Sequence, residues 1–228
     1  MPISTASNTV TEQLTEAGRA IEHDSFAIID SEAGAHGYTA EQWPLVRRMI
    51  HANADFEFNG LTAFHPDAMQ AGMRAVLKGG TPIVADVEMI CVGLSKPRLA
   101  HFGLSTHHYI ADPDVIEAAK AANSTRAVQA MRKAHRLGQL DGAIVGIGNA
   151  PTALIELVRL IREEGVRPAL VIGMPVGFVS AAESKDLLMT VNDVPWVAIK
   201  GRKGGSTLVV AAIHAMLSLA EAAQKKVA

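Results

Sequence analysis

Short apolar runs that alternate with helical patterns constrain the fold of this 228-residue chain more than any other feature. Each run is rich in β-branched residues and is nearly continuous, as expected for a strand that is covered on both faces. Parallel sheets with helices on both sides produce this pattern. The predicted strands span residues 82–85, 107–111, 143–147, 169–174 and 196–200.

Helical patterns fill the intervals between these strands and also precede the first of them. The predicted helices span residues 11–29, 40–53, 66–78, 113–136, 151–164, 179–189 and 206–223. The alternation predicts a three-layer α/β domain with a mainly parallel five-stranded sheet flanked by helices. Nothing marks a domain boundary, since linkers and internal repeats are missing from the sequence, so we expect one domain over residues 1–228 with a disordered stretch of about ten residues at its N-terminus.

The composition of the chain indicates which kinds of binding partner and which cellular compartment to expect. The 21 basic and 23 acidic residues nearly cancel, so no general field attracts nucleic acid or an anionic membrane. Cys91 is the only cysteine, which excludes an internal disulfide and fits a cytoplasmic protein. The polar N-terminus lacks the features of a signal peptide. Residues 206–223 are long enough to cross a bilayer, but they include His214 and Glu221, so we expect a buried or subunit-interface helix.

The turns that follow the predicted strands suggest an anion site. Ligands of open parallel sheets bind beyond the carboxyl ends of the strands, where N–H groups at helix starts favour negative charge. Three such turns contain glycine, and the residues concerned are Gly148-Asn149-Ala150, Val176-Gly177 and the basic loop 201–206. Together they predict an anion-lined basin. The alternative is that Gly and capping residues are ordinary in such turns and bind nothing.

Other chemistry at this edge is less favoured. Gly146 and Gly148 match the first two glycines of the dinucleotide fingerprint, but Pro151 takes the third place, so nucleotide binding is a poor first hypothesis. Asp86 and Glu88 follow the first strand and could act as a carboxylate pair. The simpler interpretation is that they cap the next helix and accept hydrogen bonds from neighbouring loops.

The helix predicted near residue 40 carries a candidate proton donor. Thr39 and Gln42 fit a capping box, although Pro44 could move the first regular turn onward. Arg48 and His51 are three residues apart, so they lie on neighbouring parts of the helix surface and can reach one cleft. The helix dipole near the C-terminus favours a protonated imidazole. A surface or packing role for His51 is the alternative.

The sequence also contains no combination of residues that predicts a metal site. His107 and His108 are adjacent, so in a strand they point to opposite faces and cannot ligate one metal by themselves. Motifs for zinc proteases, nucleophile elbows and phosphate-binding loops are absent from the sequence.

Several segments together resemble one known family, that of precorrin-8X methylmutases of cobalamin biosynthesis. The matching blocks extend from Ser25 to about Ala211, whereas residues 91–110 carry little of the family signature. "GMPVGFVSAAESKD" and "GRKGGS" are specific in combination. The blocks are "SFAIIDSEA", "RRMIHA", "DVEM", "NSTRA", "GIGNAPTAL", "GMPVGFVSAAESKD" and "KGRKGGS".

The resemblance implies a cofactor-independent and metal-free isomerase that moves a methyl group between neighbouring carbons of ring C. The expected reaction converts precorrin-8X to hydrogenobyrinate. The alternatives are the same step on cobalt-precorrin-8, giving cobyrinate, and a corrinoid carrier without turnover. The resemblance also implies a homodimer with a shared site, for which helix 206–223 offers a pairing surface, and product handover to the next enzyme of the pathway.

The resemblance also assigns roles to individual residues. His51 of "RMIHA" would be the general acid that protonates a ring nitrogen of the substrate. The arginines would pair with the substrate carboxylates, and small residues would let the backbone approach the macrocycle. The residues expected to bind substrate are Ser25, Arg48, Arg126, Gly148, Asn149, Ala150, Val176, Gly177, Gly201, Arg202, Lys203, Gly204 and Gly205.

Overall fold

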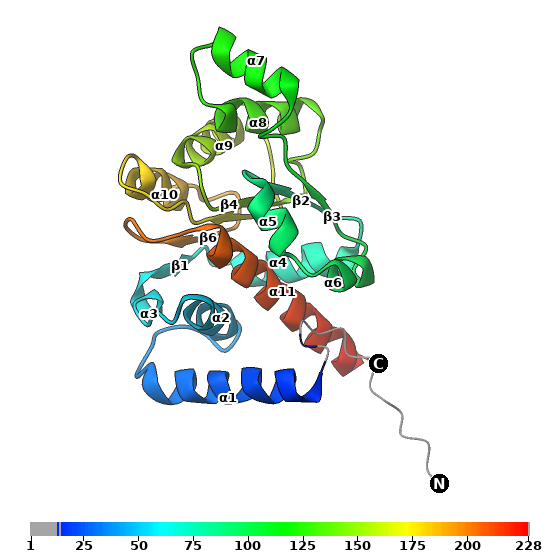
Figure 1. Cartoon of the computed structure of the whole chain (residues 1–228), viewed down its shortest axis with the longest axis vertical. Coiled ribbons are helices and arrows are strands. Elements are labelled where there is room, and N and C mark those ends of the chain that lie inside the picture. The colour runs from blue at the N-terminus through cyan, green and yellow to red at the C-terminus, as the bar shows by residue number, and fades with distance from the viewer. Residues whose placement is uncertain (1–12, 14, 228) are drawn as a thin grey trace.

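One mixed sheet organises the computed structural model, which describes residue 13 and residues 15–227 (Figure 1). The sheet has six strands in the order β1-β6-β5-β4-β2-β3. β1 runs antiparallel to β6, and all other neighbours are parallel. The strands are β1 (Thr62–Phe64), β2 (Pro82–Ala85), β3 (Ser105–His107), β4 (Ile144–Ile147), β5 (Leu170–Gly173) and β6 (Trp196–Ile199).

Helices cover both faces of this sheet and enclose two separate apolar cores. The larger core lies between the sheet and the helices α2, α4, α5 and α11, while the other lies between the sheet and α8, α9 and α10. The predicted three-layer architecture is therefore confirmed. The helices are α1 (Glu16–Glu32), α2 (Trp43–Asn53), α3 (Phe58–Leu61), α4 (Ala68–Lys78), α5 (Glu88–Gly93), α6 (Lys96–His101), α7 (Pro113–Ala121), α8 (Arg126–Arg136), α9 (Pro151–Glu163), α10 (Ala181–Met189) and α11 (Ser206–Val227).

The structure differs from the prediction in several elements, and the helices α3, α5 and α6 have no predicted counterpart. The sixth strand, β1, was not predicted, because three residues are too few to show a hydrophobic period. The strand predicted at 107–111 lies at 105–107 instead, paired in parallel with β2. The helix predicted at 113–136 is two helices, since Asn123 adopts a left-handed φ of 45° and the Thr125 side chain caps α8. The expected disorder of the first ten residues lies outside the described residues.

The C-terminal helix α11 is a buried core helix, which is one of the two alternatives predicted for it. It is long and apolar enough to cross a membrane by length and composition alone. Its apolar residues, among them Leu208, Val209 and Leu217, are nevertheless buried, and the helix packs mainly against α2 and α4. The expectation that this helix offers a surface for subunit pairing stays a prediction, with Val210 and Leu219 as its partly buried apolar residues.

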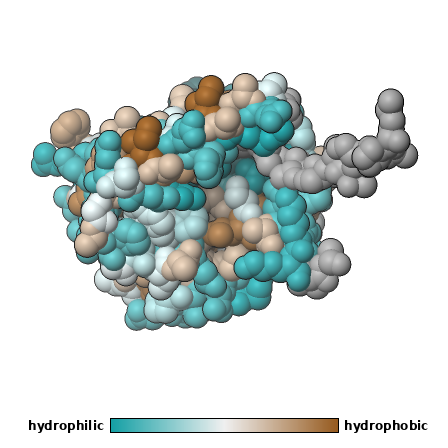
Figure 2. All heavy atoms as spheres, turned by 90° about the horizontal axis from the view of Figure 1, so that it is seen from below, coloured by the Kyte–Doolittle hydropathy of each residue, from teal (hydrophilic) through white to brown (hydrophobic). Residues whose placement is uncertain are grey.

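Helix α1 is packed differently from α11, because among the helices it contacts mainly α2 and lies at the edge of the molecule (Figure 1). Ile21 and Ile28, which are seven residues apart and so share one face, are exposed. Figure 2 shows the side of the molecule on which α1 lies. That surface is mainly hydrophilic, with hydrophobic residues in a recess and in small areas beside it.

A buried polar cluster joins α6 to α11. Arg98 is 2% exposed, and its Nη1 lies 3.2 Å from Nδ1 of His214, while its Nη2 donates to the Ser218 hydroxyl at 2.9 Å. Burial lowers the pKa of His214 to about 4 and the pKa of Arg98 to about 10. The imidazole of His214 is therefore neutral at neutral pH, and its Nε2 accepts the backbone N–H of Ser95 at 3.3 Å.

We expect this histidine to make the fold acid-sensitive. Its pKa of about 4 in the folded chain lies below its ordinary value of 6.5, so between these values the unfolded chain binds a proton that the folded chain does not. The stabilisation is complete above pH 6.5 and is lost as the pH falls toward 4. Urea unfolding should show this group lowering the free energy of unfolding by about 2 kcal/mol between pH 7 and pH 5.

The variant His214→Gln isolates this contribution, because glutamine does not titrate. The loss of stability between pH 7 and pH 5 should be smaller in the variant than in the natural protein by that amount. Equal losses in the two proteins would show that His214 does not cause the acid sensitivity.

Candidate active site

The helix that carries His51 begins with the predicted capping box. The Thr39 N–H donates to Oε1 of Gln42 at 3.1 Å, and the Gln42 N–H donates to Oγ1 of Thr39 at 3.2 Å. Regular helix starts only at Trp43, with Pro44 in its first turn, so α2 begins three residues later than predicted. At the other end Ala54 adopts a left-handed conformation. His51 is therefore in the last turn, where a positive charge is favoured.

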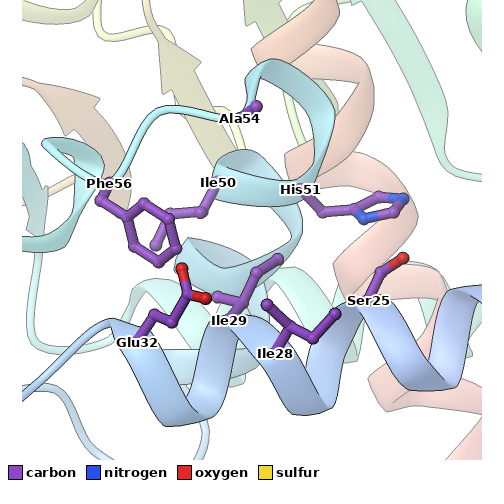
Figure 3. Close-up of a pocket in the computed structure, with 8 residues that line it drawn as sticks. All are labelled: Ser25, Ile28, Ile29, Glu32, Ile50, His51, Ala54 and Phe56. Carbon is purple, nitrogen blue, oxygen red and sulfur yellow. The ribbon is translucent and has the colours of Figure 1, made fainter.

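A pocket of about 240 Å³ lies between α1 and α2 (Figure 3). Ser25 from α1 and His51 from α2 lie toward one end of it, and Glu32 and Phe56 lie toward the other. Between them the lining is apolar. The Ser25 hydroxyl donates to the carbonyl of Ile21 within its own helix at 2.8 Å, which leaves its oxygen able to accept another hydrogen bond. The structure thus brings two of the predicted site residues together.

Phe26 links His51 to Arg48. Its ring meets the His51 imidazole edge-on, with 5.3 Å between the centroids, and the Arg48 guanidinium lies 5.4 Å from the same ring. Arg48 and His51 therefore do share one neighbourhood, as their spacing predicted. The Arg48 side chain is mostly buried and pairs with Glu22 through an Nη2–Oε1 distance of 3.0 Å. A substrate carboxylate that binds Arg48 has to compete with Glu22 or share the guanidinium with it.

The turn after β4 already holds an anion, and that anion is the protein's own. The carboxylate of Asp86, at the end of the neighbouring strand β2, accepts the N–H groups of Gly148 at 3.1 Å, Asn149 at 2.8 Å and Ala150 at 2.7 Å. The expectation that these three N–H groups hold a substrate carboxylate is therefore corrected. The simpler interpretation of Asp86, as an acceptor for a neighbouring loop, is the one that the structure shows.

Asp86 is fully buried in this position. Burial raises the pKa of its carboxyl group, and the hydrogen bonds from the turn oppose that rise. Gly148 is required for a separate reason, since a Cβ at this position would lie 2.7 Å from the Cα of Ser206. The small residue lets the turn pack against the start of α11, whereas the resemblance implied an approach to the macrocycle.

The loop between β6 and α11 is held from two sides. The ammonium of Lys203 pairs with Asp55 and Glu57, which follow α2, and lies 2.9 Å from Oε2 of Glu57. The hydrogen bond to Lys203 lowers the pKa of Asp55. From the other side, the buried Lys185 of α10 donates to the carbonyl of Lys203 at 2.7 Å. Burial lowers the pKa of Lys185 to about 8.

These bonds change the predicted role of Lys203. Its charge is already balanced by two carboxylates of the same chain, so it fixes the loop to the end of α2 rather than standing ready for a substrate carboxylate. Arg202, by contrast, is exposed and lies over the ring of Phe178, with 5.5 Å from the guanidinium carbon to the ring centroid. Of the two cations, Arg202 has the more exposed side chain.

The loop after β5 is joined to both neighbouring loops. The N–H of Gly177 donates to the carbonyl of Arg202 at 3.2 Å, and the N–H of Val176 donates to that of Gly148 at 3.4 Å. Gly205 donates to Met174 at 2.8 Å, and a Cβ at Gly204 would lie 2.2 Å from the carbonyl oxygen of Met174. Three of the predicted binding turns therefore form one continuous edge, in which the N–H groups of Val176, Gly177 and Gly205 bond to other loops. Gly201 lies in the same loop with a positive φ of 76°.

Arg126 stands at the opposite end of this edge. It is the first residue of α8, and a 2.9 Å contact between the hydroxyls of Thr125 and Thr152 places that helix start beside the start of α9. Its side chain is exposed. On the near end, Oγ1 of Thr207 lies 3.4 Å from Oδ1 of Asn53, which brings α2 next to α11. The predicted residues thus form a row from His51 across the loops toward Arg126.

Comparison with known proteins identifies the family of the chain. Residues 20–219 match the profile of the family described as precorrin-8X methylmutase, CbiC. The chain belongs to this family. Precorrin-8X methylmutases are isomerases of cobalamin biosynthesis, so the resemblance seen in the sequence motifs is confirmed.

Individual methylmutases are similar to this chain over nearly their whole length. The cobalt-precorrin-8 methylmutase of Leptospira interrogans is 51% identical over 212 residues, which cover 91% of this chain and 96% of the relative. That of Priestia megaterium is 51% identical over 208 residues, 91% of each chain. A crystal structure described as precorrin-8x methyl mutase from Thermus thermophilus has a TM-score of 0.83 and 51% identity, and covers 90% of this chain and 99% of its own.

Several contacts of the candidate site were not predicted. Glu22 and Phe26 contact Arg48 from another helix, and Asp55 contacts Lys203, which is 148 residues away. No spacing rule links such distant residues, so no sequence signal could have found these pairs. Within the described part of the chain, no group of three or more His, Cys, Asp or Glu side chains could hold a metal ion.

Proposed function

We propose that this methylmutase acts on cobalt-precorrin-8 and gives cobyrinate. The relatives from Leptospira interrogans and Priestia megaterium, both 51% identical, are named for the cobalt-containing substrate, whereas the Thermus thermophilus structure at the same identity is named for precorrin-8x. The two names for cobalt-precorrin-8 favour this substrate over the metal-free precorrin-8X that the sequence motifs first suggested. The cobalt belongs to the substrate and needs no ligand from the protein. The observation that carries the proposed chemistry is the position of His51 at the end of α2, beside Arg48 and the edge formed by the loops.

In the proposed reaction His51 is a general acid. Its imidazolium donates a proton to the conjugated macrocycle, and this withdraws electrons from ring C. In cobalt-precorrin-8 the cobalt occupies the ring nitrogens, so the acceptor is a carbon of the conjugated system, whereas in metal-free precorrin-8X it is a ring nitrogen. The bond from the methyl group to one ring carbon breaks while a bond to the neighbouring carbon forms. The proton then returns to the imidazole, so the reaction is an isomerisation without net gain or loss of atoms.

Binding of the substrate is assigned to groups that can reach its acid side chains. Arg48, Arg126 and Arg202 supply guanidinium groups, which pair with carboxylates in two-point contacts. Ser25 supplies a hydroxyl beside His51. The turns at 148–150, 176–177 and 201–205 form the floor under the macrocycle, with their backbone fixed by Asp86 and by each other. We also propose a homodimer in the cytoplasm, from the family relationship, with product handover to the next enzyme.

The decisive experiment gives the purified protein precorrin-8X and cobalt-precorrin-8 separately and follows the absorption spectrum. We expect conversion of both, with a kcat/KM at least about tenfold higher for the cobalt form. A higher kcat/KM for the metal-free form would overturn the choice of substrate. Stoichiometric binding of the pigment without conversion would instead show a corrinoid carrier.

A further inference from the structure

A second pocket lies at the end of α2, the helix that carries His51. It has a volume of about 360 Å³ and lies between the end of α2, helix α5 and the first turns of α11. Ala52, the residue after His51, contributes to its lining. We call it the α5–α11 pocket. Its lining consists of Ala52, Met89, Val92, Gly93, Ser206, Thr207 and Val210.

This pocket is apolar, although the basic loop 201–205 ends directly beside it. No charged side chain lines it, and its polar side-chain atoms are the hydroxyls of Ser206 and Thr207. Ser206 is the first residue of α11 and directly follows the basic loop. The pocket therefore lies between the candidate proton donor and the loop that carries Arg202.

Helix α5 presents apolar side chains on two sides. Ile90 is fully buried in the core, whereas Met89 is 62% exposed and Val92 is 70% exposed. These two are three residues apart, so they share one face of the helix. Gly93 lets α5 pack closely on α11, since a Cβ there would lie 2.8 Å from Cγ2 of Val210. The exposed pair is thus held rigidly at the pocket.

An apolar wall beside a charged edge matches the chemistry of one ligand. Single exposed apolar residues are common, but a concave apolar patch next to convergent polar groups is typical of a small-molecule site. A corrinoid has a flat ring with apolar faces and methyl groups, and charged acid arms around its rim. The pocket is too small for the whole macrocycle, but it can receive one edge of the ring while the arms extend toward the arginines.

We infer that the α5–α11 pocket binds the methyl-bearing apolar edge of the corrinoid, with Met89 and Val92 as its wall. This inference rests on the proposed function. The edge is held against α5, which places the ring across the end of α2 and within reach of His51. Met89 and Val92 therefore determine substrate affinity, whereas the chemistry belongs to His51.

The test compares variants of Val92 and Met89 with a matched control. Val92→Asp adds a charge that repels the acidic substrate, Val92→Asn adds polarity alone, and Met89→Gln keeps the length of the side chain. Leu137→Asp makes the same kind of change at an exposed residue that follows α8, away from the pocket. The dissociation constant of hydrogenobyrinate is measured by absorbance titration, together with KM and kcat for the converted substrate.

We expect Val92→Asp to raise both the dissociation constant and KM by about tenfold or more, and Val92→Asn and Met89→Gln to raise them by smaller factors. Leu137→Asp should change neither. Unchanged values in all pocket variants, with a natural protein that binds and converts the substrate, would overturn the pocket assignment alone. A natural protein that neither binds nor converts any corrinoid would overturn the proposed function as well.

Light scattering on the same samples tests whether a second copy of the chain, rather than the ligand, covers the pocket wall. Val92→Asp should leave the molar mass unchanged. A smaller mass for Val92→Asp than for the natural protein would show that a second copy of the chain covers this wall, and would overturn the ligand assignment.

Discussion

Replacing His51 by alanine is expected to lower kcat by at least about a hundredfold, because general acid catalysis contributes roughly that factor or more. Binding of the product should change little, since the carboxylate-binding arginines stay in place. The imidazole meets Phe26 edge-on at the end of α2, and its neighbours Ser25 and Arg48 do not depend on it for their own hydrogen bonds. The measurement is single-turnover conversion followed by absorbance, paired with titration of the product.

His23→Ala is the matched control for this variant. His23 lies on the exposed surface of α1, so its removal tests the loss of a histidine near the site without the loss of the proposed acid. We expect the control to retain the natural kcat within about twofold. Undiminished turnover in the His51 variant would remove this residue from the mechanism. A loss of product binding in the His51 variant equal to its loss of turnover would assign His51 to binding.

Replacing Asp86 by alanine is expected to lower the free energy of unfolding by about 3–5 kcal/mol, because it leaves the three N–H groups of the turn at 148–150 buried or partly buried without their acceptor. Asp86→Asn should cost less, since the amide oxygen still accepts, but its NH₂ group faces other donors. The midpoint of thermal unfolding should also fall, by roughly 10 °C for the alanine variant.

Glu88→Gln is the control for the Asp86 variants. Glu88 is two residues further along the chain and is exposed, with only a distant contact of 3.9 Å to His108. Glu88→Gln should change the free energy of unfolding by no more than about 0.5 kcal/mol. An Asp86→Ala protein that unfolds within about 1 kcal/mol of the natural one would show that the turn does not depend on this carboxylate.

The parallel part of the fold was predictable from the sequence because buried strands and amphipathic helices have distinct periods. β2 and the strands β4 to β6 are long enough to show as apolar runs, and their predicted positions agree with the structure to within a residue or two. The short strand β1 and the helices α3, α5 and α6 were missed. Elements of three to six residues show too little of any period, and pairing with distant partners decides their conformation.

The site was predictable where the chemistry is local. The spacing of Arg48 and His51 correctly placed both side chains in one neighbourhood, beside the ring of Phe26, since a helix fixes neighbours three residues apart. The partners of charged groups were not predictable. A helix start and a glycine turn indicate an anion, but they do not tell whether the anion comes from a ligand or, as with Asp86, from the end of the adjacent strand.

The contacts of Lys203 have a consequence for protein engineering. Lys203 joins the segment just after the histidine-bearing helix to the loop before α11, and Lys185 ties that loop to α10. The position of His51, the proposed proton donor, therefore depends on three stretches of chain that are far apart in the sequence. Transplanting the first two helices onto another scaffold would carry over the imidazole of His51 but not the contacts that fix its position.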